Sequence, residues 1–152
     1  MKIFTSVVTV SLLLMSSLSF ADDRTEDPIE SRQNLMKNMG KSMKVLGPIY
    51  AYKIPFNVPI VMKSADSLVE HANTEYLLDS FPEGSLAEDS KSKIEIWNNW
   101  EEFSEMMSDL ETNANNFKQV ASMGLEDSVT AFKQLTESCS ACHKKYRSKN
   151  NK

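Results

Sequence analysis

Apolar residues recur at steps of three and four along four stretches of the chain, which predicts four amphipathic helices. The first stretch opens at Asp27 and Pro28, an N-cap and a proline suited to the first helical turn, and Gly47-Pro48 is expected to end it. No proline follows Pro82, so the last two helices are expected to be long and unkinked. The four stretches span residues 27–46, 58–78, 96–117 and 125–146.

The rest of the pattern contains little that would build a sheet. After residue 21 there is no sustained period-two alternation and no Asn-Gly or Asp-Gly hairpin turn. Amphipathic helices joined by short loops bury their apolar faces best by packing side by side. The predicted fold class is therefore all-α, an antiparallel four-helix bundle that occupies residues 22–152 as one domain.

Residues 1–21 have a different character. Lys2 supplies a positive start, an apolar run extends from Val7 through Leu18, and Ser19-Phe20-Ala21 forms a small-x-small end. These are the parts of a secretory signal peptide, and the run is too short for a permanent membrane span. We therefore predict a signal peptide over 1–21 and a soluble mature protein, most simply in a bacterial periplasm. An uncleaved membrane anchor is the less favoured alternative.

Composition narrows the class of protein further. The 152 residues are 41% hydrophobic and 25% charged, an ordinary balance for a domain with a core of its own. Lys and Arg number 17 against 21 Asp and Glu, which gives a formal net charge of −4. Nucleic-acid binding is disfavoured, because the chain lacks the excess of positive charge that attracts phosphate. Two Cys are too few for a disulfide scaffold, so their spacing becomes informative.

Both cysteines belong to one short motif. Cys139-Ser140-Ala141-Cys142-His143 has the form C-x-x-C-H, which is typical of covalent attachment of c-type haem. Residues three apart lie on one face of a helix, so both thiols can add to the vinyl groups of one porphyrin. His143 follows directly and is expected to bind the iron as the proximal ligand, which makes haem c the predicted cofactor.

Other interpretations of the motif fit less well. A thioredoxin-like redox pair requires a βαβ setting, and a structural zinc site requires four ligands, whereas the remaining histidine, His71, is distant in sequence. A disulfide between Cys139 and Cys142 is possible in an oxidising compartment but leaves His143 without a purpose. A helical bundle that binds no haem and acts through protein contacts is the weakest alternative.

The motif and three other segments resemble the cytochrome c′ family, the class II cytochromes c. The C-terminal segment 139–147 resembles the family's attachment motif, and segment 81–85 resembles its interhelix turn. Ile96-Trp97 is similar to a pair in the family's third helix, and segment 32–37 to its first helix. The chain departs from the family at Lys93-Ile94-Glu95, because many members carry a proline just before Ile-Trp. The resemblance covers essentially the whole mature chain and implies haem attached near the C-terminus of a bundle.

The resemblance also implies where function is decided, on the face of the iron opposite His143. In low-spin members a methionine of the first helix is the sixth ligand and the protein carries single electrons; Met36 matches that position. Five-coordinate members leave a pocket that admits NO or CO. Met36, Met39 and Met43 are also spaced as simple core packing. Electron transfer, with Met36 and His143 as iron ligands and no enzymatic activity, is the favoured interpretation.

Four further features carry weaker expectations. The resemblance places Arg32 near a haem propionate, with a solvated surface arginine as the alternative. His71 is expected at the surface rather than on the iron. Trp97 and Trp100 are expected in the core, and Trp97 is also expected to contact the porphyrin.

Two further expectations concern partners. The positive charges of the basic tail 144–152 are favoured at a helix C-terminus, and the alternative is that the tail docks an acidic redox partner protein. Family members commonly form homodimers through their first two helices.

Overall fold

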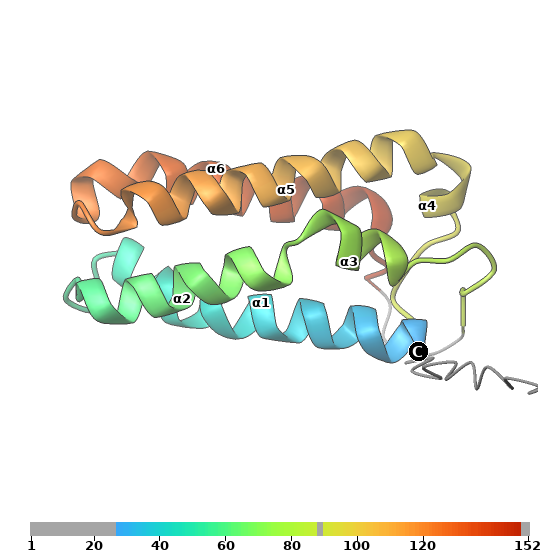
Figure 1. Ribbon diagram of the computed structural model, residues 1–152, viewed down its shortest axis with the longest axis horizontal. Helices are drawn as coiled ribbons and strands as arrows, with labels where there is room; N and C mark the ends of the chain where they lie inside the picture. Colours follow the sequence, from blue (N-terminus) through green and yellow to red (C-terminus); the bar gives the residue numbers. More distant parts are fainter. Residues whose placement is uncertain (1–26, 88–89, 150–152) are drawn as a thin grey trace, which may run out of the picture.

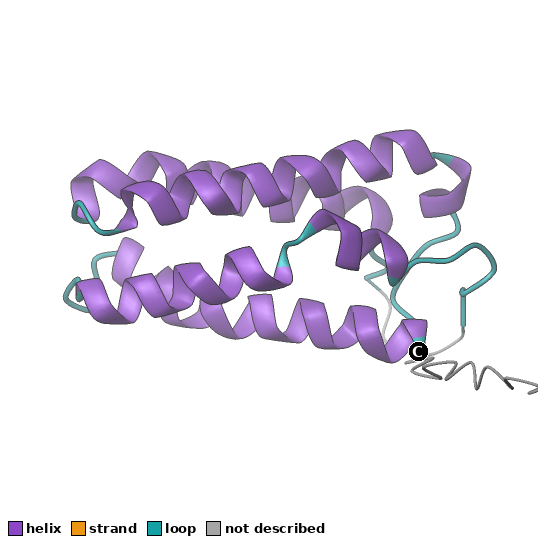
Figure 2. Ribbon diagram, in the orientation of Figure 1, coloured by secondary structure: helices purple, strands orange, loops and turns teal. Residues whose placement is uncertain are grey.

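The computed structural model describes residues 27–87 and 90–149, so the predicted signal peptide lies outside the described residues. Four helical rods pack side by side (Figure 1), and every regular element of the described residues is helical (Figure 2). This confirms the predicted all-α four-helix bundle. The elements are α1 (Pro28–Tyr50), α2 (Val58–His71), α3 (Thr74–Asp79), α4 (Glu95–Asn98), α5 (Trp100–Ala121) and α6 (Leu125–Tyr146).

Helix α1 begins as predicted and ends later than predicted. The Asp27 carboxylate accepts a hydrogen bond from the Ile29 amide at 2.9 Å, and Pro28 occupies the first turn. The expectation that Gly47-Pro48 ends the helix is wrong, because α1 continues through both residues. A proline ring clashes with the Cβ of the preceding residue in a helix, and Gly47 has no Cβ. The chain leaves the helix at Tyr52, which adopts a φ of 57°.

The second predicted helix is two helices, α2 and α3. Asn73 interrupts the pattern, because its side-chain oxygen accepts a hydrogen bond from the Tyr76 amide at 3.1 Å and so caps a new helix. The Glu111 carboxylate of α5 accepts from the Thr74 amide at 3.2 Å and fixes this junction from the neighbouring rod. Tyr76 of α3 is 61% exposed.

The third predicted helix also breaks, at Asn99 and without a proline. Asn99 leaves the helical region with φ −132° and ψ 47°, and its side-chain amide donates to the Glu95 carbonyl at 2.9 Å. Asparagine favours such local bonds over helix continuation. Trp100 consequently starts α5 at the surface, 37% exposed, so its expected place in the core is wrong. The prediction of a long continuous helix is confirmed for α6.

The core lies between the rods. Helix α5 packs most extensively against α6 and α2, and α1 packs most extensively against α2. None of the helices in residues 27–87 and 90–149 is both long and apolar enough to cross a bilayer. The largest fully buried side chains of the core are Phe103, Phe117, Leu46, Leu68, Leu77, Ile96, Met107, Leu135 and Val61.

Candidate functional site

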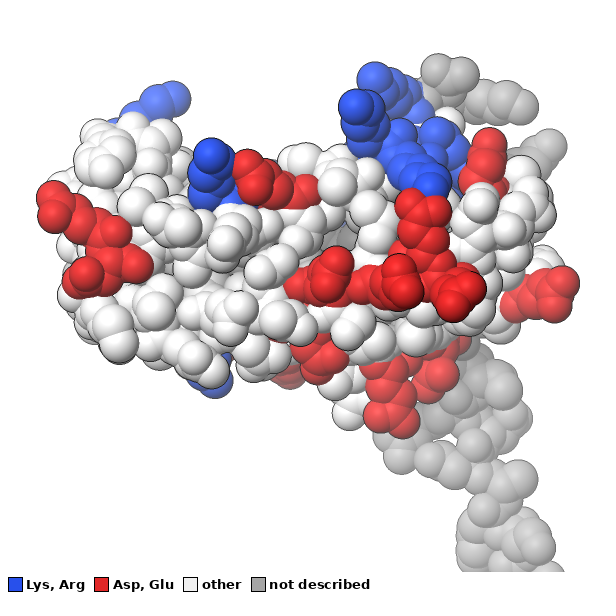
Figure 3. Space-filling model, turned by 90° about the horizontal axis from the view of Figure 1, so that it is seen from above, with Lys and Arg blue, Asp and Glu red and all other residues white. Residues whose placement is uncertain are grey.

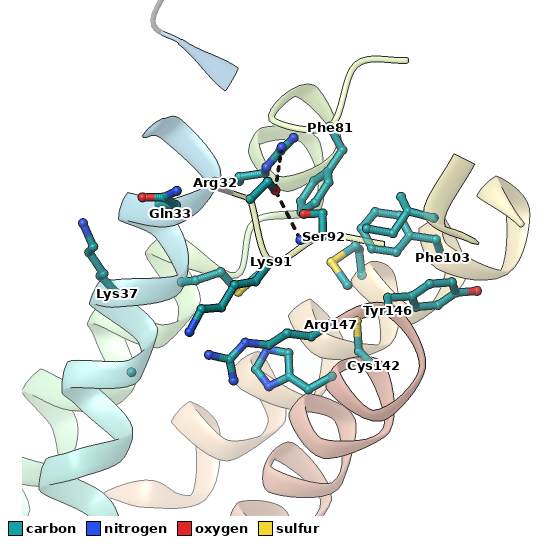
Figure 4. Close-up of a pocket in the computed structure, with 16 residues that line it drawn as sticks. Arg32, Gln33, Lys37, Phe81, Lys91, Ser92, Phe103, Cys142, Tyr146 and Arg147 are labelled. Atoms are coloured by element: carbon teal, nitrogen blue, oxygen red, sulfur yellow. Dashed lines mark hydrogen bonds between the residues drawn. The ribbon is translucent and has the colours of Figure 1, made fainter. Parts of the chain in front are cut away.

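A cavity of about 540 Å³ opens at the end of the bundle where α1 begins and α6 ends (Figure 4). A volume of this size lies within the range of sites that hold organic cofactors. Helices α1, α5 and α6 and the segment between α3 and α4 all contribute to its wall. Its lining residues include Met36 and Gly40 from α1, Phe81, Ile96, Phe103 and Met107, and Cys142 and His143 from α6.

The α6 wall carries the C-x-x-C-H motif. Cys142 and His143 line the cavity, and Cys139, one turn earlier, is half-buried against the core. Both thiols are free. Burial, with a further contribution from Cys139, raises the pKa of the Cys142 thiol to about 11, and burial also raises the pKa of Cys139. Both cysteine side chains are therefore neutral thiols at neutral pH, and they lie on one face of α6.

His143 stands beside these thiols at the cavity wall. Partial desolvation, followed by the positive charge of Arg147, lowers its pKa below the ordinary histidine value. A neutral imidazole keeps a nitrogen lone pair available, and that is the form that binds a metal. In the described part of the chain, no three His, Cys, Asp or Glu side chains gather as a metal cluster. The arrangement offers one metal ligand on α6, not the four of a structural zinc site.

The α1 wall of the cavity presents a thioether and a bare stretch of backbone. Met36 and Gly40, one helical turn apart, both line the cavity. Met39 is 6% exposed in the core, and Met36 and Met43 both pack against that core, but of these three methionines Met36 alone lines the cavity. A Cβ added at Gly40 would meet no atom within 4 Å. Glycine inside a helix costs about 1 kcal/mol relative to alanine, so a glycine here is not explained by helix stability. The space that Gly40 leaves beside Met36 enlarges the cavity, which suits the binding of a bulky group.

Aromatic rings form another part of the wall. Phe103 is central, with edge-to-face contacts to Phe81 at 5.0 Å and to Tyr146 at 5.4 Å between ring centroids. Two backbone hydrogen bonds close this end of the bundle: the Lys93 amide donates to the Tyr146 carbonyl at 3.1 Å, and the Ser148 amide donates to the Lys91 carbonyl at 2.8 Å. The segment before α4 is thus tied across the end of α6, beside the apolar face of the cavity.

Arg32 lines the cavity and also holds its rim together. Its side chain is only 3% exposed, so the interpretation as a solvated surface arginine is wrong. The guanidinium donates to the Ser85 hydroxyl at 2.8 Å, the Ser85 carbonyl at 2.6 Å, the Ser90 hydroxyl at 3.0 Å and the Ser80 carbonyl at 3.3 Å. It also lies over the Phe81 ring, 5.1 Å from the centroid. Arg32 therefore fixes the segment after α3 against α1.

Two residues considered in the sequence lie away from the cavity. His71 sits between α1 and α2, where its Nδ1 donates to the Ser67 carbonyl at 2.7 Å and its Nε2 accepts from the Asn38 amide at 3.0 Å. Trp97 donates from its indole nitrogen to the Phe81 and Pro82 carbonyls, each at 3.1 Å. It lines a separate hollow with Trp100 and is not among the residues that line the cavity, which does not support the expected contact with the porphyrin.

The structure adds residues that the sequence pattern did not single out. Gly40 faces the cavity, and a glycine inside a long amphipathic helix is the signal that could have pointed to it. Phe103 and Tyr146 were indistinguishable from ordinary core residues in the pattern. Lys37 and Lys91 come from segments far apart in sequence, and nothing in the pattern indicated that they share one cavity.

The chain matches known proteins over most of its length. A family model described as Cytochrome C′ matches residues 27–147. Cytochrome c-554 of Cereibacter sphaeroides is 30% identical over 145 residues, which cover 93% of this chain and 94% of that protein.

Solved structures share the fold. Cytochrome c prime from Shewanella frigidimarina superposes with a TM-score of 0.75 at 24% identity, over 80% of this chain and 94% of that one. A nitric oxide complex of a point mutant of cytochrome c prime from Alcaligenes xylosoxidans has a TM-score of 0.74 at 21% identity, over 82% of this chain and 95% of that one. With the cavity and the family match together, this chain belongs to the cytochrome c′ family and is a monohaem c-type cytochrome with covalently bound haem c.

Proposed function

We propose that the mature chain, residues 22–152 after removal of signal peptide 1–21, is a periplasmic one-electron carrier rather than an enzyme. Cys139 and Cys142 would hold the haem by thioether bonds, and His143 and Met36 would be the ligands of its iron. The observation that carries this proposal is the position of Met36: it lines the cavity on α1, whereas His143 lines it on α6. Met36 and Met43 both pack against the core and Met39 lies within it, but neither Met39 nor Met43 lines the cavity.

The residues around the cavity suit such a carrier. When bound, the haem supplies a one-electron couple, and His/Met ligation raises its reduction potential. The neutral imidazole of His143 and the soft thioether of Met36 each offer a lone pair in either oxidation state. Phe81, Phe103 and Tyr146 exclude water from one side of the cavity. A site whose ligands and walls stay fixed needs little rearrangement when an electron arrives or leaves.

Arg32 has a supporting role in this proposal. The segment that it fixes to α1 carries Ser90, Lys91 and Ser92, all of which line the cavity. The guanidinium at the cavity wall also suits a haem propionate, because arginine pairs well with carboxylates. Arg32 thus both shapes the site and supplies positive charge near the porphyrin edge.

Axial ligation is tested by spin state. The purified holoprotein is expected to be low-spin as the ferric form, and Met36→Ala is expected to convert it to high spin and to open the ferrous iron to carbon monoxide. Met39→Ala is the matched control: it removes the same side chain from the same helix, in the core, and should lower stability with the spectrum unchanged. A high-spin wild-type spectrum that Met36→Ala leaves unaltered would contradict the proposal.

Gas binding is the second candidate function. The open space at Gly40 beside Met36 favours it, because a small pocket on the α1 wall could admit a diatomic molecule without displacing a side chain. The nitric oxide complex of the Alcaligenes xylosoxidans protein, a structural neighbour, gives this candidate further support. Rapid binding of NO or CO by high-spin wild-type protein would select it over electron transfer.

Electron transfer requires other redox proteins as partners. We further propose that two copies of the chain form a homodimer through α1 and α2. Val45 of α1 and Ile60 of α2 are 42% and 48% exposed, and Ile54 of the connecting loop is 51% exposed. Such apolar side chains suit a contact between two copies. Sedimentation equilibrium of wild type and of Ile60→Glu would test it: a dimer in wild type only supports the contact, and identical masses contradict it.

A further inference from the structure

Every charged residue among the described ones that line the cavity is basic. Arg32, Lys37, Lys91 and Arg147 line it, and no Asp or Glu of residues 27–87 and 90–149 does. This occurs in a chain whose formal net charge is −4. Lys37, Lys91 and Arg147 are exposed, whereas Arg32 is buried and bonded to the segment after α3. We call the three exposed residues, Lys37, Lys91 and Arg147, the basic rim.

The dipole of α6 explains only one residue of the basic rim, Arg147. Cations at the C-terminus of α6 are favoured by that dipole, and this accounts for Lys144, Lys145 and Arg147. Lys37 lies in the interior of α1 and Lys91 in the segment before α4, so neither stabilises the end of α6 in this way. The fold brings charges of one sign together from three separate segments.

The figures show how this charge is arranged. In Figure 4 the ends of Lys37, Lys91 and Arg147 lie on one side of the cavity and the rings of Phe103 and Tyr146 on the other. In Figure 3, Lys and Arg gather at one end of the visible face, with a band of Asp and Glu alongside.

An ion pair marks where the two charged areas meet. Lys145 of α6 pairs with Glu102 of α5. The remaining carboxylates near the start of α5, Glu101 and Glu105, are exposed on that helix and do not line the cavity. The molecule is thus polarised: basic around the cavity and acidic on the neighbouring surface of α5.

We propose that the basic rim is the docking surface for a redox partner protein whose own surface is rich in Asp and Glu around its electron-transfer centre. This inference rests on the proposed function, because it specifies the partner of the same site. Complementary charge at such a surface speeds encounter and orients the partner with its centre close to the haem.

The proposal makes a prediction of sign. One electron passes from the ferrous holoprotein to ferricyanide, giving ferric protein and ferrocyanide, and the rate is measured by stopped flow against salt. The net charge of the chain predicts repulsion of this anion, so the rate would rise with salt. The basic rim predicts local attraction, so the rate falls with salt. A trivalent cationic cobalt phenanthroline complex, reduced from cobalt(III) to cobalt(II), should show the opposite slope.

A pair of matched variants isolates the rim. Lys37→Glu should slow the ferricyanide reaction on the order of tenfold at low ionic strength and flatten its salt dependence. Lys63→Glu changes the net charge equally, at an exposed position of α2 that does not line the cavity, and should have a much smaller effect. The absorption spectrum and haem content of each variant are recorded alongside, and rates are compared only between proteins whose iron ligation matches wild type.

The outcomes separate this inference from the proposed function. Equal effects of Lys37→Glu and Lys63→Glu, or a wild-type rate that rises with salt, would overturn the inference even in a low-spin carrier. A high-spin spectrum would overturn the carrier proposal and leave the sign of the salt slope as a separate result. Binding of the holoprotein to phosphatidylglycerol vesicles that Lys37→Glu abolishes would assign the rim to an anionic membrane surface instead and would also overturn it.

Discussion

The two ends of the bundle are built from the same helices and differ in what fills the space between them. At the closed end, Tyr50 of α1 stacks on Phe132 of α6 with ring centroids 4.1 Å apart and meets Phe117 of α5 edge-on at 5.7 Å. At the cavity end, Phe103 and Tyr146 line a hollow of about 540 Å³. Aromatic side chains complete the packing at one end and leave a large volume for another group at the other.

The difference shows which end depends on the cofactor. The cavity is open to solvent and its walls include the apolar side chains of Ile96, Phe103 and Met107, so without the haem these side chains contact water. The closed end supplies its own packing, whereas the cavity end is expected to depend on the haem to cover its apolar walls.

Removal of the attachment thiols should have the largest effect. Cys139→Ala together with Cys142→Ala abolishes covalent haem, and most of the stability of the cavity end is expected to go with it, because nothing else fills the volume. Intact mass should lack the haem group, and hydrogen exchange should speed up at the start of α1 and the end of α6. If the haem-free variant kept exchange protection equal to wild type at both ends, the contrast between the two ends would be wrong.

Truncation of a core side chain at the closed end should lower stability less than loss of the haem does, and it should leave haem binding unchanged. Phe117 is fully buried against Tyr50 and Phe132, so Phe117→Ala is expected to lower the free energy of unfolding by about 4 kcal/mol. The haem absorption spectrum at neutral pH should not change, since this residue is remote from the cavity. Denaturant titration gives the first quantity and the spectrum gives the second. A shifted spectrum would mean that the two ends are coupled.

Loss of the Arg32 side chain tests how the cavity end is assembled. Arg32→Met keeps an apolar stem but removes the hydrogen bonds to Ser80, Ser85 and Ser90, and it should cost about 3 kcal/mol. Proteolysis between α3 and α4 should accelerate. Arg32→Lys keeps the charge but lacks the planar fork of donors, so it should recover less than half of the loss. Full recovery with lysine would show that charge alone matters.

Tyr50 offers the smallest and most specific test. Ser128 donates its proton to the Gly124 carbonyl at 2.5 Å, so the Tyr50 hydroxyl is the donor in its 2.7 Å bond to Ser128. Tyr50→Phe should lower stability by about 1 kcal/mol at pH 7. Burial raises the pKa of Tyr50 above 10, so the folded state keeps a proton that the unfolded state loses. The Tyr50 contribution is therefore present below pH 10 and declines as the pH rises above it.

Denaturant titration of both proteins from pH 7 to pH 11 measures this. The difference in unfolding free energy between wild type and Tyr50→Phe should shrink at the alkaline end. A constant difference across that range would contradict the assigned role of burial at this hydroxyl.

Sequence pattern predicted the number of rods but not where they break. The apolar period runs unbroken through Asn73 and Asn99, yet both residues interrupt helices, because their side chains bond to nearby backbone groups. The opposite error occurs at Pro48. The sequence predicted that α1 ends there, but the helix continues, because Gly47 has no Cβ to clash with the proline ring. Whether a residue ends a helix depends on the backbone and side-chain atoms that it contacts, and the spacing of apolar residues contains no information about those contacts.

The candidate site divides in the same way. Cys139, Cys142 and His143 lie on one helix at spacings of three and four residues from Cys139, so their shared face follows from helix geometry, and the sequence was enough to predict it. Met36 and Met39 carry identical side chains in one helix, and only the packing of α1 against its neighbours sets one at the cavity and the other in the core. Sequence could not separate them, because helix rotation depends on contacts with other rods.

The sequence by itself determined an all-helical chain with a haem attachment motif on its last helix, since both depend on spacing within short segments. Tertiary structure decided what surrounds that motif. In the folded chain Arg32 is buried, and Trp97 lies outside the cavity lining. Lys37, Lys91 and Arg147 lie together in the basic rim. These residues lie on separate segments, and only the packing of the rods, driven by burial of their apolar faces, fixes the distances between them.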